Sequence, residues 1–209
     1  MKLTFVIDKK EDRQFLFMSN KGIQKHFDDI YKKSLCYLKY IQKEYQSAWD
    51  EIDQKFSRYI VKETGYEWFY PNYTCVISVT NQGISNWGHA PKILRGWKEN
   101  PYSQRRITAH ELILSHYFEI YRRHYSSFGL TDGQVWALAE IAAFALTSLT
   151  ETAKTFWPWD FSGYYTNHNY PQIVSLQKRL EKVFLERKNF DDYIVTGIKM
   201  VKKFKDLGP

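Results

Sequence analysis

Apolar residues recur every three or four positions along a long N-terminal stretch of the chain. The series runs from Phe27 to Ile60, and this spacing gathers apolar side chains on one face of a helix. Ser19 and Asn20 precede the series, and both are residue types that cap helix N-termini. The pattern therefore predicts one long helix, or two helices broken near residue 46, that end around Gly65.

Short β-prone runs lie on either side of this helical pattern. Leu3–Ile7 and Gln14–Met18 are separated by a polar segment, which predicts a hairpin. Thr74–Thr80 is rich in β-branched residues and predicts a strand, and the turn residues after it favour a return strand over Ile84–Trp87. Gly88–Pro101 contains Gly, Pro and Asn, which predict a loop.

Helical patterns return in the second half of the chain. Arg105–Tyr125 and Val135–Leu149 are predicted helices, and Thr131 begins a capping-box sequence before the second one. Pro171–Arg187 and Asp191–Phe204 are amphipathic and predict two further helices.

These elements predict a mostly helical α+β fold. A small antiparallel sheet is expected to pack beside the helix Arg105–Tyr125 and a second helix that contains Glu140. We expect a single domain over residues 1–209. Its parts are a hairpin with long helices (1–65), a core (66–150), and an aromatic loop with C-terminal helices (151–209).

The predicted loop Thr155–Pro171 is unusually rich in aromatic residues. Its aromatic residues are Phe156, Trp157, Trp159, Phe161, Tyr164, Tyr165 and Tyr170. A solvated loop does not carry this much apolar surface, so these rings pack on something. The rings could pack on a substrate, on a partner or on the protein's own core, and packing on the core is favoured.

The net charge permits several kinds of partner, but no sequence motif indicates one of them. The net charge of +7 permits contact with nucleic acid, anionic lipid or an acidic protein, but it is spread along helices and is expected to be a solvated surface. The chain lacks a helix-turn-helix signature, a zinc finger, a P-loop, a dinucleotide-binding fingerprint and a G-x-S-x-G elbow. Nucleic acid is therefore a possible partner that no motif indicates.

The lengths of the apolar runs and the spacing of the cysteines predict the cellular compartment. The N-terminal apolar run is too short for a signal peptide, and the longest apolar stretch, Val135–Leu149, is too short to span a membrane. Cys36 and Cys75 have no metal-binding spacing and are expected to be buried thiols in a reducing compartment. These features predict a cytoplasmic protein without a membrane partner.

Three ionisable residues stand out because they lie in apolar helical segments. His110 and Glu111 lie early in the apolar helix Arg105–Tyr125, and Glu140 lies within Val135–Leu146. A buried carboxylate is costly without a partner, so Glu140 is expected to belong to a polar cluster with His110.

This arrangement over residues 73–150 resembles the active-site helices of gluzincin-type zinc metallopeptidases. The resemblance implies that His110, His116 and Glu140 hold Zn²⁺ and that Glu111 is the general base for the metal-bound water. It also implies hydrolysis of a peptide or protein substrate, aligned by an edge strand near Cys75–Asn81.

The sequence departs from the family's HExxH pattern at one position. Leu114 stands where the second histidine belongs, and the next histidine is His116. On a regular helix, side chains six residues apart diverge by about 120°, with Cα atoms about 10 Å apart. A shared metal would require a π-bulge or a break near Ser115. His89, and less strongly His168, are candidate replacement ligands.

A second hypothesis follows from Leu114. The chain would be a metal-free scaffold that binds a peptide, a protein or nucleic acid through the same cleft. A third hypothesis is a nucleic-acid-associated protein attracted by the charge of +7, whose binding would weaken steeply with salt. The sequence leaves the substrate and the oligomeric state open.

Overall fold

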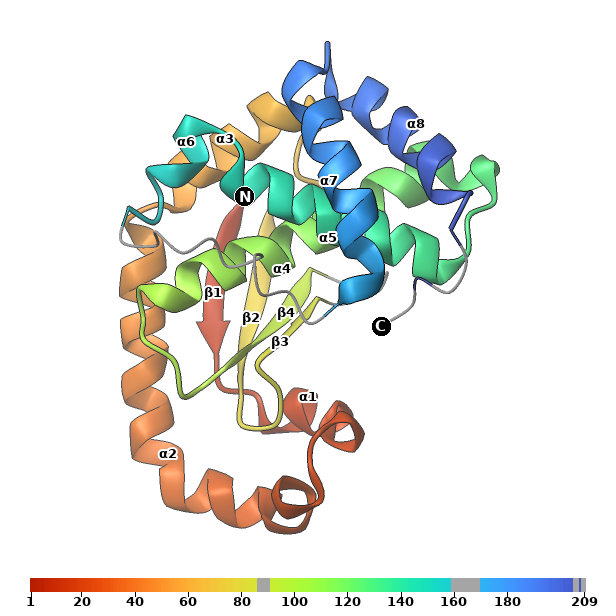
Figure 1. Cartoon of the computed structure of the whole chain (residues 1–209). Helices are drawn as coiled ribbons and strands as arrows, with labels where there is room; N and C mark the ends of the chain where they lie inside the picture. The colour runs from red at the N-terminus through yellow and green to blue at the C-terminus, as the bar shows by residue number, and fades with distance from the viewer. Residues whose placement is uncertain (86–90, 159–169, 205–206, 208–209) are drawn as a thin grey trace. The chain divides into compact units, whose positions relative to one another are not determined.

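The computed structural model of the chain describes residues 1–85, 91–158, 170–204 and 207 (Figure 1). It contains two compact units, of which the first comprises residues 1–55 and 70–115 and the second residues 56–69 and 116–209. The fold is mostly helical with one small sheet, which confirms the predicted α+β class. The expectation of a single domain stays a prediction.

A four-stranded mixed sheet forms the centre of the first unit. Its strands are β1 (Lys2–Val6), β2 (Asn72–Ser78), β3 (Gly83–Ser85) and β4 (Lys92–Gly96), in the order β1-β2-β4-β3. The pairs β1–β2 and β2–β4 are parallel, and only β3–β4 is antiparallel. The prediction of an antiparallel sheet is therefore wrong for two of the three pairs.

The predicted N-terminal hairpin is also wrong, because a helix follows β1. The Asp8 side chain accepts hydrogen bonds from the backbone N–H groups of Lys10 and Glu11 and caps α1 (Lys9–Gln14). The short 3-10 segment η1 (Leu16–Met18) follows. Parallel pairing of β1 with β2 then requires a crossover, which the helices provide.

The long helical pattern forms two helices, as one alternative predicted. α2 (Lys21–Asp50) begins at Asn20, whose side chain accepts a hydrogen bond from Ile23 N at 2.9 Å. The break comes after Asp50, later than predicted, and α3 (Asp53–Thr64) ends at Gly65. Gly65 has a φ angle of +74°, a left-handed conformation that favours glycine at helix C-termini.

The core of the first unit lies where α2 packs on the sheet. The buried strand residues are Leu3, Phe5, Cys75, Val76, Ile77, Ile93 and Leu94, and α2 contributes Leu38, Ile41, Tyr45 and Trp49. β2 is paired with a parallel strand at each edge, and its residues from Cys75 to Ser78 are buried on both faces of the sheet. Cys75 is buried as predicted, whereas Cys36 is exposed, so only one of the two thiols belongs to the core.

Helices make up most of the second unit. After the π-helical turn η2 (Tyr121–Tyr125) and the 3-10 turn η3 (Ser126–Phe128), it contains α5 (Asp132–Ser148), α6 (Glu151–Lys154), α7 (Pro171–Glu186) and α8 (Phe190–Val201). The predicted capping box at Thr131 and Gln134 is present, and the two predicted C-terminal helices are confirmed. Among the described residues, every helix falls short of the length and apolar character that a membrane span requires.

Part of the aromatic segment packs into the core of the second unit. Phe156 lies edge-on to Phe56 with ring centroids 5.7 Å apart, and Trp157 Nε1 donates a hydrogen bond to the Thr147 carbonyl at 3.0 Å. Both side chains are buried, which confirms the core expectation for these two residues. Trp159, Phe161, Tyr164, Tyr165 and His168 lie outside the described residues, as does His89.

Candidate functional site

The helix that carries the predicted catalytic residues is regular over its whole length. α4 (Ser103–Ile120) is α-helical through Ser115, and the π-helical turn begins only at Tyr121. His110 and Glu111 are each 6% exposed, so both polar side chains are held inside the protein. The helix therefore lacks the bulge or break near Ser115 that a shared metal would require.

His116 lies in an aromatic environment within the second unit. Its ring centroid is 4.6 Å from that of Trp68 and 5.3 Å from that of Phe69. Burial lowers the pKa of His116 to about 3, against smaller opposite effects of the Tyr66 backbone and of Glu119. The imidazole is therefore neutral at physiological pH and packs as a flat apolar group.

The predicted zinc ligand set of His110, His116 and Glu140 stays a prediction. On the regular helix, His110 and His116 point about 120° apart, and Leu114 is buried at the position of the missing histidine. The described residues contain no group of three His, Cys, Asp or Glu side chains placed to hold a metal ion.

Glu140 is buried on α5, as its apolar neighbours in the sequence predicted, with 5% of its surface exposed. His110 and Glu111 belong to the first unit, whereas His116 and Glu140 belong to the second. The convergence of the four residues on one point stays a prediction.

Glu111 instead lies against the start of strand β3. A Cβ atom added at Gly83 would lie 2.5 Å from Glu111 Oε1 and 2.7 Å from Arg95 Nη1. The carboxylate of α4 and the guanidinium of β4 therefore both reach the backbone of the first β3 residue. A larger residue at this position would require the ends of both charged side chains to shift.

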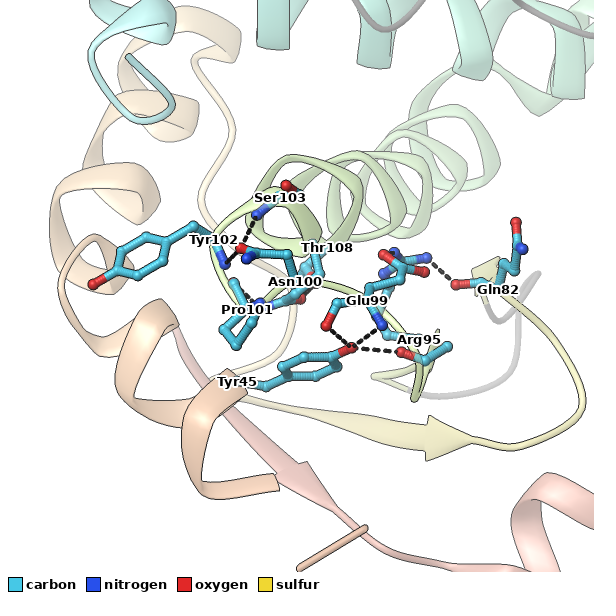
Figure 2. Close-up of polar contacts among 11 residues, drawn as sticks. Tyr45, Gln82, Arg95, Glu99, Asn100, Pro101, Tyr102, Ser103 and Thr108 are labelled. Carbon is cyan, nitrogen blue, oxygen red and sulfur yellow. Dashed lines mark hydrogen bonds and ion pairs between the residues drawn. The ribbon is translucent and has the colours of Figure 1, made fainter. Parts of the chain in front are cut away.

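Arg95 is a fully buried cation that joins three segments of the first unit (Figure 2). It donates one hydrogen bond to the Gln82 carbonyl just before β3, and its Nη2 lies 2.5 Å from Glu99 Oε2. The Tyr45 hydroxyl donates to the Gly96 carbonyl at 2.8 Å and accepts from Glu99 N at 3.1 Å. Burial raises the pKa of Glu99, although Arg95 opposes this shift.

The outer edge of β1 is closed by two glutamine side chains of α2. Gln46 accepts from Phe5 N at 2.9 Å and donates to the Leu3 carbonyl at 3.1 Å. Gln42 donates to the Phe5 carbonyl at 2.8 Å. These amides imitate a neighbouring strand, so the backbone groups of this edge are already paired.

The outer edge of β3 is different. Gly96 N donates to the Gln82 carbonyl at 2.9 Å, so in the antiparallel ladder Ile84 is the next residue bonded to β4. The backbone N–H and C=O groups of Gly83 and Ser85 consequently point away from β4. Within the described part of the chain, the structure records no side-chain hydrogen bond to these outward groups.

This geometry corrects the predicted peptide-aligning strand. Cys75 and its neighbours belong to β2, which is paired on both sides and has no free edge. Among the residues that the structure describes, β3 is the end strand next to β4, and no hydrogen bond is recorded on its outer side.

A buried aspartate organises the carboxyl end of β2. Asp12 accepts hydrogen bonds from Ser78 Oγ (2.5 Å), Thr80 Oγ1 (2.6 Å), Val79 N (2.8 Å) and Tyr31 OH (2.8 Å). These four donors compensate a carboxylate that has no solvent exposure. The loop after β2 is therefore held in one conformation.

Asp12, Arg95 and the two glutamines were not predicted as site residues from the sequence. Gln42 and Gln46 directly follow the buried Ile41 and Tyr45 and are themselves four residues apart, and this spacing on a core-facing helix was an available signal. Arg95 gave no comparable signal, because its strand was predicted to be a loop.

Comparisons with known proteins identify no relatives: no family model, curated protein or solved structure matches the chain.

Proposed function

We propose that this chain is a binding module for an extended polypeptide segment, which adds as a strand to the outer edge of β3. The observation that carries the proposal is the pair of unequal sheet edges. β1 is closed by Gln42 and Gln46, whereas Gly83 and Ser85 of β3 present outward backbone groups. Strand addition uses such groups to bind the peptide main chain.

The surroundings of β3 favour binding because they hold the strand in place. Arg95 bonds to the Gln82 carbonyl, and the Arg95 and Glu111 side chains pack against Gly83. A preformed strand loses little conformational entropy when a peptide pairs with it. Its three residues also limit the length of the exposed edge, which protects the free protein from self-association.

A proline substitution tests the proposal at the outward N–H group. Ser85→Pro removes that donor but leaves the bonds to β4 intact, and proline is tolerated in this setting on edge strands. The probe is an array of immobilised random-sequence dodecapeptides, incubated with fluorescently labelled protein. We expect wild type and Ser85→Ala to bind a common set of peptides and Ser85→Pro to lose them. Equal binding by the Pro and Ala variants, or no binding by wild type, would refute the proposal.

Hydrolysis of the bound peptide is a second candidate function. It is favoured by the order of elements, because the edge strand β3 is followed by β4, by the His110–Glu111 helix α4 and by the Glu140 helix α5. It is disfavoured by Leu114 and by the aromatic packing of His116. We therefore rank it below binding and derive no catalytic step.

One measurement separates the two candidates. Binding alone predicts that dialysed protein takes up no stoichiometric zinc in calorimetry and leaves bound array peptides uncleaved. One zinc ion per chain, lost in both His110→Ala and Glu140→Gln, together with cleavage lost in Glu111→Gln, would instead establish the metallopeptidase.

A further inference from the structure

A cavity of about 330 Å³ lies in the first unit. It is lined by Asn20, Ile23 and Ile30 of the α2 region, by residues 78–82 after β2, and by residues 96–99 after β4. Ser78 and Gly96 are the last residues of two parallel strands. Ligands of open α/β sheets bind outside such carboxyl ends, so this position is a favourable one.

Both loops of the cavity are held by hydrogen bonds to buried side chains. Asp12 holds the loop after β2 through the hydroxyls of Ser78 and Thr80 and through Val79 N. Tyr45 and Arg95 hold the loop after β4 at Glu99 (Figure 2). Preformed walls of this size suit a small planar group.

A row of aromatic rings leads from the cavity along α2. The ring centroids of Trp97 and Tyr37 are 5.8 Å apart, and those of Tyr37 and Tyr40 are 6.3 Å apart. Tyr37 and Tyr40 are 45% and 56% exposed, although rings of this size usually bury most of their surface. Both rings are therefore accessible to solvent beside a cavity whose lining includes residues with amide side chains.

Positive charge accompanies this row. The Lys98 ammonium lies 4.8 Å from the Trp97 ring centroid. Lys33 lies four residues before Tyr37 on the same face of α2. The N-terminus of α2, at Asn20 and Ile23, also lines the cavity and adds partial positive charge.

We propose that this surface binds single-stranded nucleic acid. Tyr37 and Tyr40 would stack on successive bases, and one base would enter the cavity beside Trp97. Aromatic faces stack on any base, and the side-chain amide of Gln82, which lines the cavity, would supply hydrogen bonds to the base edge. The site does not depend on strand addition at β3.

The test is fluorescence anisotropy with a fluorescein-labelled oligouridylate of about twelve nucleotides, within the range of site sizes for single-strand binding modules. Tyr37→Ala and Tyr40→Ala should each weaken binding about tenfold, and the double variant more. Both side chains are well exposed, so the variants should keep the wild-type melting temperature. Tyr102→Ala is the matched control, because Tyr102 is also 45% exposed in the same unit.

The salt dependence of the binding affinity distinguishes binding at this site from general attraction of the strand by the net charge. Two lysines that neutralise two phosphates predict a slope of about −1.4 in a plot of log affinity against log salt. A much steeper slope, unchanged by Tyr37→Ala, would mean that diffuse charge binds the strand and would overturn the proposal. So would equal binding of a duplex, equal competition by free uridine monophosphate, or competition only by the dodecapeptides that bind β3.

Discussion

The two edges of the sheet carry the same kind of backbone groups but have different neighbours. At β1, a long helix runs alongside the strand and places Gln42 and Gln46 against it, so that Leu3 and Phe5 are paired by side-chain amides (Figure 1). At β3, the charged side chains of Arg95 and Glu111 pack against Gly83. No described side chain forms a hydrogen bond with the outward backbone groups of the strand. The comparison shows that an edge strand can bind a further strand only where its outward backbone groups are not already paired. An edge with unpaired groups is therefore a candidate binding site.

Acidification should have the largest effect on the unfolding free energy. It should leave peptide binding at the sheet edge unchanged as long as the protein is folded. The pKa of His116 is lowered to about 3, so the unfolded chain binds a proton that the folded chain rejects between about pH 6.5 and pH 3. The stability that this group contributes is complete above about pH 6.5 and is lost as the pH falls, by about 1.4 kcal/mol per pH unit.

Urea unfolding at several pH values measures this slope. His116→Phe should flatten it, because phenylalanine suits the Trp68 and Phe69 environment and does not titrate. Peptide binding at β3 should stay constant while the protein is folded, since its backbone groups do not titrate. An unchanged acid slope in His116→Phe would contradict the assigned environment.

Opening the closed edge is the second way to test the comparison. The double variant Gln42→Ala/Gln46→Ala removes three hydrogen bonds to the β1 backbone, at about 1 kcal/mol each. We expect a loss of about 2–4 kcal/mol in unfolding free energy and concentration-dependent association in sedimentation experiments. Lys39→Ala/Lys43→Ala, at exposed positions of the same helix, is the control. A stable monomeric glutamine variant would show that the closure of β1 has no consequence.

Filling the space behind the open edge is the third test. In Gly83→Ala the new Cβ atom meets Glu111 Oε1 and Arg95 Nη1 at distances that no unstrained contact allows. We expect overpacking to lower the unfolding free energy by about 1–3 kcal/mol and to weaken binding of the array peptides. Thermal and urea denaturation measure the first effect, with Ser85→Ala as the reference. Wild-type stability would mean that Gly83 is not packed as described.

The smallest effect on stability should come from Ser85→Pro. Its lost N–H points away from β4, so we expect the unfolding free energy to change by no more than about 0.5 kcal/mol. Peptide binding, by contrast, should be lost. A loss of binding without a loss of stability would show that the outward N–H group of β3 serves binding alone. A large destabilisation would show that the residue 85 N–H is used within the protein.

Local patterns predicted the elements that are long and strongly periodic. The caps at Asn20 and Thr131, the end of α3 at Gly65 and the helices α4, α5, α7 and α8 follow from side chains close in sequence. Burial of Glu140 was also predicted, because apolar residues on all sides of a helix leave no face for water. Strand β4 was missed because its apolar run is only Ile93 and Leu94, and its pairing with β2 and β3 is a non-local event.

By itself, the sequence determined the mostly helical α+β class, the helix boundaries set by caps and glycine, and the burial of Glu140. Tertiary structure alone decided the parallel pairing of the strands, the aromatic surroundings of His116 and the contrast between the closed and open edges. The physical reason is range. Caps and amphipathic faces depend on neighbours within a few residues, whereas the partner of a strand or a buried charge comes from a distant segment that only folding brings near.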